Sequence, residues 1–195
     1  SNACSPRWVA RSHTRHDRRG LVMTGSRRGP DPDRIRSMFA SIAGRYDRAN
    51  TVLSGGIHHR WRTRMVRWSG ATAGQSVLDC ATGTGDLAIA FKRAVGESGE
   101  VIGTDFCAEM LAPAPAKAKA RGLDIVFETA DVMDLGYADH RFDFASIAFG
   151  IRNVADPAKG MAEMARVVKP GGAVLILEFG QVAVPVFRQL YDFYA

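Results

Sequence analysis

The sequence predicts an α/β fold in which a mostly parallel sheet carries helices on both faces. From Gly70 onward, short β-rich runs alternate with helical runs, the order that parallel strands joined by crossover helices produce. The β-rich runs are continuously apolar, as expected for strands that are covered on both faces. The expected strands are residues 76–80, 101–104, 125–129, 142–148 and 173–179.

Helices are expected between these strands and before the first of them. The segments between the strands are residues 86–95, 108–120 and 157–168. Pro113 and Pro115 weaken the second of these, because proline lacks the amide hydrogen and its ring clashes with the preceding turn. A short amphipathic helix is also expected over residues 35–47. Its apolar positions at helical spacing are Ile35, Met38, Phe39 and Ile42.

A second amphipathic helix is expected over residues 57–68, the run IHHRWRTRMVRW. Its apolar stripe consists of Ile57, Trp61, Met65 and Trp68, and the arginines around the other face are Arg60, Arg62, Arg64 and Arg67. Burial of the stripe against the protein's own core is the favoured interpretation. Contact of this basic helix with an anionic bilayer is the alternative.

Composition indicates one globular domain. The chain has 195 residues, of which 46% are hydrophobic and 24% charged, a balance that allows a sizeable core. No run approaches the roughly 20 apolar residues of a membrane-spanning helix, and the start lacks the apolar stretch of a signal peptide. A cytoplasmic location is therefore expected. The three cysteines, Cys4, Cys80 and Cys107, lack the spacing of a zinc site, so no metal is expected.

The net charge of +6 comes from the beginning of the chain. Residues 1–30 hold seven arginines against the single acidic residue Asp17, whereas the basic and acidic residues of 31–195 balance. Residues 1–33 are interpreted as a disordered basic arm, and Ser1-Asn2-Ala3 as the scar of a removed expression tag. The domain proper is expected over 34–195. A nucleic-acid partner is not expected, because the positive charge is confined to this arm.

The run from Ser76 to Asp86, SVLDCATGTGD, predicts a strand that enters a glycine loop and then a helix. Gly83 and Gly85 permit positive φ angles and let backbone N–H groups approach a ligand at the positive end of that helix. In open α/β sheets, ligands bind at this carboxyl end of the strands. A nucleotide-like ligand is therefore expected at the loop.

Three carboxylates narrow the class of that ligand. Asp79 lies four residues before Gly83, which gives the D-x-x-x-G-x-G pattern of methyltransferases, whereas dehydrogenases have an apolar strand there. Asp105 ends the second strand, where a carboxylate accepts hydrogen bonds from ribose hydroxyls in both classes. Asp131 follows the third strand, where it could accept from the adenine amine. A nicotinamide-dependent oxidoreductase remains the less favoured alternative, and each carboxylate taken singly could be a turn or cap residue.

Five stretches together resemble the ubiquinone/menaquinone biosynthesis C-methyltransferases. They are FASIAGRYD (39–47), GGIH (55–58), VLDCATGTGDL (77–87), FGIRNV (149–154) and LEF (177–179). This resemblance implies a Rossmann-like class I methyltransferase fold with S-adenosyl-L-methionine as the cofactor. It further implies transfer of a methyl group to a ring carbon of a demethylated prenyl-quinol, with either a naphthoquinol or a benzoquinol as the acceptor.

The resemblance also implies roles for individual residues. On the cofactor side, the implied pocket residues are Thr84, Asp105, Asp131, Val132 and Ala148, beside Asp79, Gly83 and Gly85 of the loop pattern. Ala148 stands where a serine is common in the family, and Asp131 where an asparagine can occur. On the quinol side, the implied residues are Tyr46, Arg152 and Asn153.

The chemistry requires alignment of the sulfonium methyl with a nucleophilic ring carbon and exclusion of water. A quinol carbon becomes nucleophilic when a ring hydroxyl loses its proton, which a base or an oriented water assists. Arg152 is a poor base because its pKa lies above about 12, so it is assigned to orienting that water and stabilising the developing phenolate. Asn153 would hold the same network, and Tyr46 would stack on the ring or hydrogen-bond a quinol oxygen. Arg152 as a merely structural ion-pairing residue is the alternative.

The resemblance implies that strands following residue 179 are absent from this chain. Residues 174–178 would then form an exposed apolar edge, and pairing of chains through it predicts a homodimer or poor solubility. Two other functions stay open. The chain could methylate a different small molecule, or it could be a cofactor-binding protein without activity.

Overall fold

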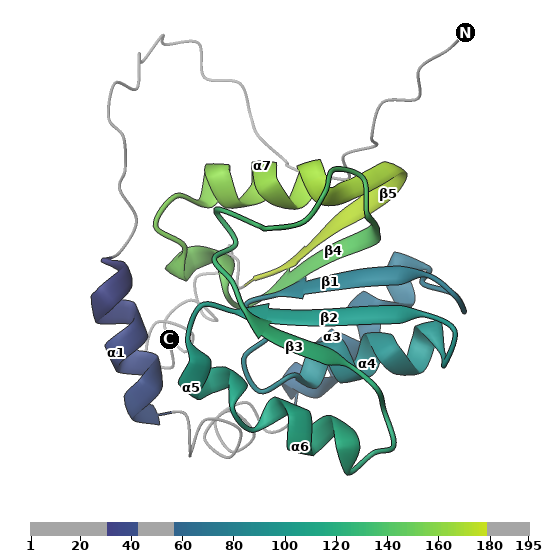
Figure 1. Cartoon of the computed structure of the whole chain (residues 1–195), viewed down its shortest axis with the longest axis horizontal. Helices are drawn as coiled ribbons and strands as arrows, with labels where there is room; N and C mark the ends of the chain where they lie inside the picture. Colours follow the sequence, from purple (N-terminus) through teal and green to yellow (C-terminus); the bar gives the residue numbers. More distant parts are fainter. Residues whose placement is uncertain (1–30, 43–56, 179–195) are drawn as a thin grey trace, which may run out of the picture.

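The computed structural model describes residues 31–42 and 57–178 (Figure 1). Residues 1–30 of the expected arm, Tyr46, and the chain beyond residue 178 lie outside the described residues. The elements below are therefore those of the described ranges.

The sheet has five strands in the order β3-β2-β1-β4-β5 (Figure 1). The strands are β1 (Ser76–Cys80), β2 (Glu100–Asp105), β3 (Val126–Thr129), β4 (Phe142–Ala148) and β5 (Val168–Leu177). All four pairings are parallel, and the register brings Cys80 beside Thr104 and Ala148 beside Leu177. The predicted parallel α/β fold is confirmed, and the carboxyl ends of its strands meet at one edge of the sheet.

Helices cover both faces of this sheet (Figure 1). The elements outside the sheet are α1 (Pro32–Ile42), α3 (Ile57–Ser69), α4 (Asp86–Val95), α5 (Ala108–Leu111), α6 (Ala114–Lys119), the 3-10 helix η2 (Ile151–Asn153) and α7 (Pro157–Val167). One core cluster joins α7 to one face, where Leu78 and Ile147 are fully buried. A second joins α3 and α4 to the other face, where Val77 and Phe91 are fully buried. Burial on both faces explains why the central strands are continuously apolar.

The expected helix 108–120 is broken into α5 and α6. The break falls at Ala112 and Pro113, since the proline has no N–H to continue the helix and instead begins the next one. The last strand was expected from residue 173 but begins at Val168, and an irregular register between Phe142 and Phe144 accommodates the earlier start. The α4 helix has the predicted bounds.

The favoured interpretation of the α3 stripe is wrong. Met65 is 6% exposed, but Ile57 is 46%, Trp61 38% and Trp68 74% exposed. The inner side of α3 instead carries buried Met65 and Val66 together with Arg62, whose guanidinium lies 3.1 Å from the Asp86 carboxylate of α4. This ion pair and the packing of Met65 and Val66 in the α4 core cluster set the rotation of α3, which leaves most of the stripe facing solvent. Among the described helices, none is long and apolar enough to cross a membrane.

Candidate active site

A cavity lies at the carboxyl edge of the sheet, beside the glycine loop. Its lining comes from α1 and α5, from the carboxyl ends of β2 and β4, from the loops after β1, β2, β3 and β4, and from the end of η2 with the residues that follow it. Six of the eleven site residues expected from the sequence line it, namely Gly83, Asp105, Asp131, Val132, Ala148 and Asn153. Further lining residues that sequence reasoning missed are Phe39, Phe106, Met110, Met133 and Phe149.

The glycine loop is held by its own backbone and by the sheet. Gly83 and Gly85 have φ angles of 56° and 82°, in the left-handed region that favours glycine. The Thr82 N–H donates to the Thr104 carbonyl across 2.9 Å, and the Gly85 N–H donates to the Thr82 carbonyl across 3.0 Å. A Cβ on Gly85 would lie 3.0 Å from Ala114 Cβ and from the ring of Phe127. Gly85 therefore lies beneath the loop, where only glycine fits, while Gly83 faces the cavity.

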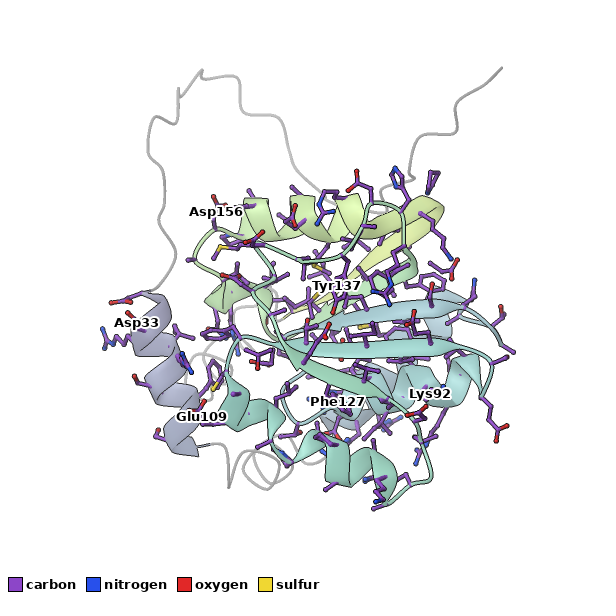
Figure 2. All side chains as sticks on the ribbon, in the orientation of Figure 1. Asp33, Lys92, Glu109, Phe127, Tyr137 and Asp156 are labelled. Carbon is purple, nitrogen blue, oxygen red and sulfur yellow. The ribbon has the colours of Figure 1, made fainter. Side chains whose placement is uncertain are left out.

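Phe127 supports this loop from β3, and Figure 2 labels its position. A Cβ on Gly103 of β2 would lie 2.8 Å from the same ring. The ring therefore occupies the space that side chains at both glycines would need. No local sequence pattern predicts this contact, because Gly85, Gly103 and Phe127 come from three separate parts of the chain.

Asp105 is the carboxylate best placed to meet a ligand in the cavity. It is 7% exposed, and its Oδ2 accepts the Gly83 N–H at 2.8 Å while its Oδ1 accepts the Cys107 N–H at 2.9 Å. Burial raises the pKa of this carboxyl, and the backbone N–H groups oppose that rise. A carboxylate has about four lone-pair positions, so each oxygen can accept a further hydrogen bond from the cavity side.

Asp79 lies beneath the loop and outside the cavity wall. It is 1% exposed, and its two oxygens accept hydrogen bonds from Thr82 Oγ1 at 2.6 Å and from Ser146 Oγ at 2.7 Å. Desolvation by burial raises its pKa from 3.8 to about 6, against the lowering effect of these two hydroxyls. The contacts of Asp79 join the glycine loop to β4, so its direct structural effect is on the shape of the loop.

Four side chains from three helices and the loop meet at the first turn of α4. The Lys117 ammonium lies 2.6 Å from Asp86 Oδ1 and donates to Thr84 Oγ1 at 3.1 Å, while Arg62 reaches Asp86 Oδ2 at 3.1 Å. We call Arg62, Thr84, Asp86 and Lys117 the Asp86 cluster. Thr84 is 5% exposed and belongs to this cluster, and its predicted role at the cofactor pocket stays a prediction. Sequence reasoning missed Lys117, because the contact depends on how α6 packs.

The wall beyond β3 combines a turn with apolar side chains. Asp131 is exposed, and its Oδ1 accepts the Met133 N–H at 2.8 Å, which closes a short side-chain turn. Val132 is 9% exposed, lines the cavity and packs into the α7 core cluster. Asp131 Oδ2 is not used by this turn.

The wall beyond β4 holds the residues expected on the acceptor side. Ala148 ends β4 and is half-buried on the cavity, and Asn153 ends η2 beside it. The Arg152 side chain is 52% exposed, and its guanidinium lies 3.6 Å from the Glu178 carboxylate. Arg152 is thus at the rim and not on the lining. Tyr46, the third expected residue, lies outside the described residues.

Phe149 links this wall to α3. Its φ of 59° is unusual for a residue with a side chain, and its N–H donates to the Leu177 carbonyl at 2.7 Å. Its ring lies 6.1 Å from the ring of Trp61. The positive φ therefore turns an aromatic side chain toward the cavity at the end of β4. Within the ranges that the structure describes, no group of three or more His, Cys, Asp or Glu side chains could hold a metal ion.

Comparison with known proteins decides the family. The model of the ubiE/COQ5 methyltransferase family matches residues 28–195. The chain belongs to this family. It is 64% identical over 170 residues to a ubiquinone/menaquinone biosynthesis C-methyltransferase from Bdellovibrio bacteriovorus, covering 87% of this chain and 72% of that protein. It is 45% identical over 163 residues to a demethylmenaquinone methyltransferase from Halalkalibacterium halodurans, covering 83% of this chain and 66% of that protein.

A solved structure supports the fold. The S-adenosylmethionine-dependent methyltransferase from Aquifex aeolicus superposes with a TM-score of 0.60 at 24% identity, over 80% of this chain and 77% of that one. The methyltransferase class expected from the sequence is confirmed by the family and the fold together. The individual site residues expected from the sequence stay predictions.

Proposed function

We propose that the protein transfers a methyl group from S-adenosyl-L-methionine to a ring carbon of a demethylated prenyl-quinol. The observation that carries the cofactor half is Asp105, a buried carboxylate that faces the cavity while two backbone N–H groups hold both its oxygens. The names of the two relatives support a quinone-pathway acceptor. Both relatives are longer than the aligned part of this chain, so acceptor and partners remain part of the proposal.

On the cofactor side, the chain's own residues bind and orient. Asp105 would accept from the ribose hydroxyls, Gly83 lets the backbone approach, and Asp131 Oδ2 would accept from the adenine amine with Val132 against the base. When bound, the cofactor supplies an electrophilic methyl group. Asp79 and Gly85 act beneath the loop by keeping its shape, and Thr84 acts through the Asp86 cluster. Ala148 contributes apolar surface and no hydrogen bond from its side chain.

On the acceptor side, the chain must make a ring carbon nucleophilic. The quinol hydroxyl loses its proton to a base or to an oriented water, and a guanidinium near the oxygen favours the resulting phenolate. Arg152 at the rim would supply that charge, and Asn153 on the lining would hold the same water. Tyr46 is proposed to contact the quinol ring. The apolar side chains Phe149 and Met133 would exclude water from the reacting atoms.

Two measurements test the proposal in sequence. Thermal unfolding is recorded with S-adenosyl-L-methionine, S-adenosylhomocysteine and NAD, because a ligand that binds the folded state raises its stability by mass action. The expected result is a rise with the first two compounds and none with NAD. A rise with NAD alone would contradict the cofactor assignment and favour an oxidoreductase.

Methyl transfer is then followed with chemically reduced demethylmenaquinone and with a demethylated benzoquinol. Methylated product from either acceptor supports the proposal, and the ratio of the two rates gives the ring preference. Binding of the cofactor without transfer to either would favour another small-molecule acceptor or a protein that binds without turnover.

A homodimer through β5 is part of the same proposal. In the described residues β5 is an edge strand, and Ile176 on it is 44% exposed. An unpaired strand edge is a template for pairing with a second chain. Light scattering checks this expectation, and a monodisperse monomer contradicts it.

A further inference from the structure

The outer face of α3 combines exposed aromatic rings with arginines. Residues 57, 64 and 68 recur at intervals of seven and four, about two turns and one turn of helix, so they lie on one side of α3. Ile57 is 46% and Trp68 74% exposed, and the Arg64 guanidinium lies 4.6 Å from the centre of the Trp68 ring. An indole of this size left three-quarters in water is unfavourable unless another surface covers it.

This face has a strong positive charge. The thirteen residues of α3 include four arginines and no acidic residue. Arg62 is neutralised by Asp86 on the inner side, but no carboxylate of the described chain pairs with Arg60, Arg64 or Arg67. A hollow on the surface is lined by these three arginines, Ile57, His59, Trp61, Thr63 and Trp68. The outer face is therefore both apolar and cationic.

We infer that the outer face of α3, made of Ile57, Arg60, Arg64, Arg67 and Trp68, docks the protein on an anionic lipid bilayer. Tryptophan is favoured at the headgroup level, where its ring meets the acyl boundary and its N–H stays hydrated. Each arginine near an anionic surface adds about 1 kcal/mol of attraction. Arginine stems also cover apolar surface while the guanidinium remains in water.

The fixed position of α3 makes this face a rigid docking surface. The helix is held from below by Met65 and Val66, which are buried against α4 and the sheet, and by the Arg62–Asp86 pair. Trp61, on the same helix, lies 6.1 Å from Phe149 at the wall of the cavity. Docking through α3 would thus bring the acceptor side of the cavity close to the bilayer surface. Docking on a bilayer determines where the protein binds and is independent of the reaction proposed above.

Vesicle sedimentation of the full chain tests the inference. The vesicles contain equal parts of phosphatidylglycerol and phosphatidylcholine, with phosphatidylcholine alone as the comparison, and hold no quinol. Binding is expected with the anionic vesicles and is expected to weaken with added salt. Absence of binding to anionic vesicles overturns the docking surface and leaves the proposed reaction untouched, so the two can fail separately.

Two variants distinguish the contribution of α3 to vesicle binding from that of the basic arm, residues 1–33. Trp68→Ala keeps the charge and should lower the partition coefficient about tenfold, because the indole no longer enters the interface. Arg64→Gln should lower it about fivefold, the equivalent of one interfacial charge. Lys159→Gln removes one exposed charge from α7, on the opposite face of the sheet, and should leave binding unchanged. Equal binding by the Trp68→Ala, Arg64→Gln and wild-type chains would assign the attraction to residues 1–30 and overturn the inference.

Two other occupants of the face are checked with the same variants. Analytical ultracentrifugation of wild type and Trp68→Ala would overturn the inference if the variant alone loses a dimer while both chains bind vesicles equally. A fluorescently labelled DNA duplex would overturn it if both variants weaken duplex binding and neither weakens vesicle binding. A blue shift of tryptophan emission on addition of anionic vesicles, lost in Trp68→Ala, would support it, because it reports entry of that indole into the interface.

Discussion

The two sides of the cavity differ in how firmly their polar groups are held. On the proposed cofactor side, Asp105 on the wall and Asp79 beneath the loop are buried, and both oxygens of each carboxylate accept hydrogen bonds from within the protein. On the acceptor side, Arg152 is half-exposed and has a carboxylate 3.6 Å away, at the far limit of an ion pair. The cofactor side is thus preorganised by the sheet and its loops, whereas the acceptor side is built on a three-residue turn.

This difference has a physical origin. The same ligand group must be held in one geometry for every reaction, and strand ends and glycine loops supply backbone groups that cannot rotate away. The proposed lipid-soluble ring must enter and leave, and a half-exposed residue at the rim allows that. Substitutions on the two sides should therefore have different effects. On the proposed cofactor side they should lower cofactor affinity and the free energy of unfolding, and on the proposed acceptor side they should lower kcat.

Replacing Asp105 by Asn should produce the largest effect on the cofactor side. The amide keeps one acceptor and turns an NH₂ donor toward either Gly83 or Cys107, and it loses the charge that strengthens hydrogen bonds to ribose. Affinity for S-adenosyl-L-methionine should fall roughly a thousandfold, about 4 kcal/mol. Isothermal titration calorimetry measures the dissociation constant of S-adenosyl-L-methionine for both chains. Asp156→Asn is the matched control, because Asp156 caps α7 without lining the cavity and asparagine caps equally well.

The Asp79 carboxyl should give the fold a pH dependence that Asp79→Asn lacks. Its folded pKa of about 6 lies above the value of 3.8 expected in the unfolded chain, so the folded state binds the proton more tightly. The stabilisation is complete below about pH 3.8 and is lost as the pH rises through 6. Up to roughly 3 kcal/mol of unfolding free energy is involved.

Urea unfolding of both chains between about pH 4 and pH 7 checks this expectation. The wild type should lose stability relative to Asp79→Asn as the pH rises. Taking the difference between the two chains cancels the other carboxyls, such as Asp143, whose lowered pKa acts in the opposite direction. A difference that does not change with pH would contradict the assigned role of Asp79 burial.

The Gly85→Ala substitution should destabilise the protein by about 2 kcal/mol, because the positive φ is strained for alanine and its Cβ would press on Ala114 and Phe127. Gly122→Ala is the matched control, since Gly122 also has a positive φ of 66° but has nothing within 4 Å of its Cβ position. That control should cost about 1 kcal/mol. Equal losses of unfolding free energy in urea would show that the contact with Phe127 contributes nothing.

On the acceptor side, Arg152→Ala should lower kcat about twentyfold and leave the dissociation constant of S-adenosyl-L-methionine unchanged. The reason is that a rim guanidinium acts on the developing phenolate and does not touch the cofactor pocket. Arg141→Ala is the control, because Arg141 is also exposed and pairs with Glu100 at 2.9 Å. Unchanged turnover in Arg152→Ala would leave this residue with a structural role only.

The smallest expected effect concerns the Asp86 cluster. Lys117→Met keeps the apolar stem and removes the ammonium that bridges Asp86 and Thr84. Affinity for S-adenosyl-L-methionine should fall about fivefold, near 1 kcal/mol, because the loop is held less firmly. Lys119→Met, on the exposed side of the same helix, should bind the cofactor as the wild type does. A response as large as that of Asp105→Asn would mean that Lys117 contacts the ligand directly.

Much of the fold could be predicted because each signal was local. The bounds of β1 and α4 follow from the glycine loop between them, and those of β4 follow from its mostly apolar run. The positive φ of Gly83 and Gly85 follows from the same loop motif. Predictions failed where a distant partner decided the outcome. The α3 stripe was expected to be buried, but Arg62 turned inward to Asp86, which lies 24 positions along the chain. The prediction of one continuous helix over residues 108–120 was wrong for a local reason, because Pro113 interrupts the helix.

The alternation of strands and helices, the glycine loop and the family follow from residue order and spacing, which encode them directly. Which polar groups line the cavity depends on how separate elements pack together. Asp79 and Asp105 are both predicted for the cofactor pocket, yet Asp79 lies beneath the loop and Asp105 on the wall. Lys117 and Phe127 joined the site through α6 and β3, and the face of α3 stayed in solvent. Such outcomes depend on which side chains meet across separate elements, and no spacing along one chain segment carries that information.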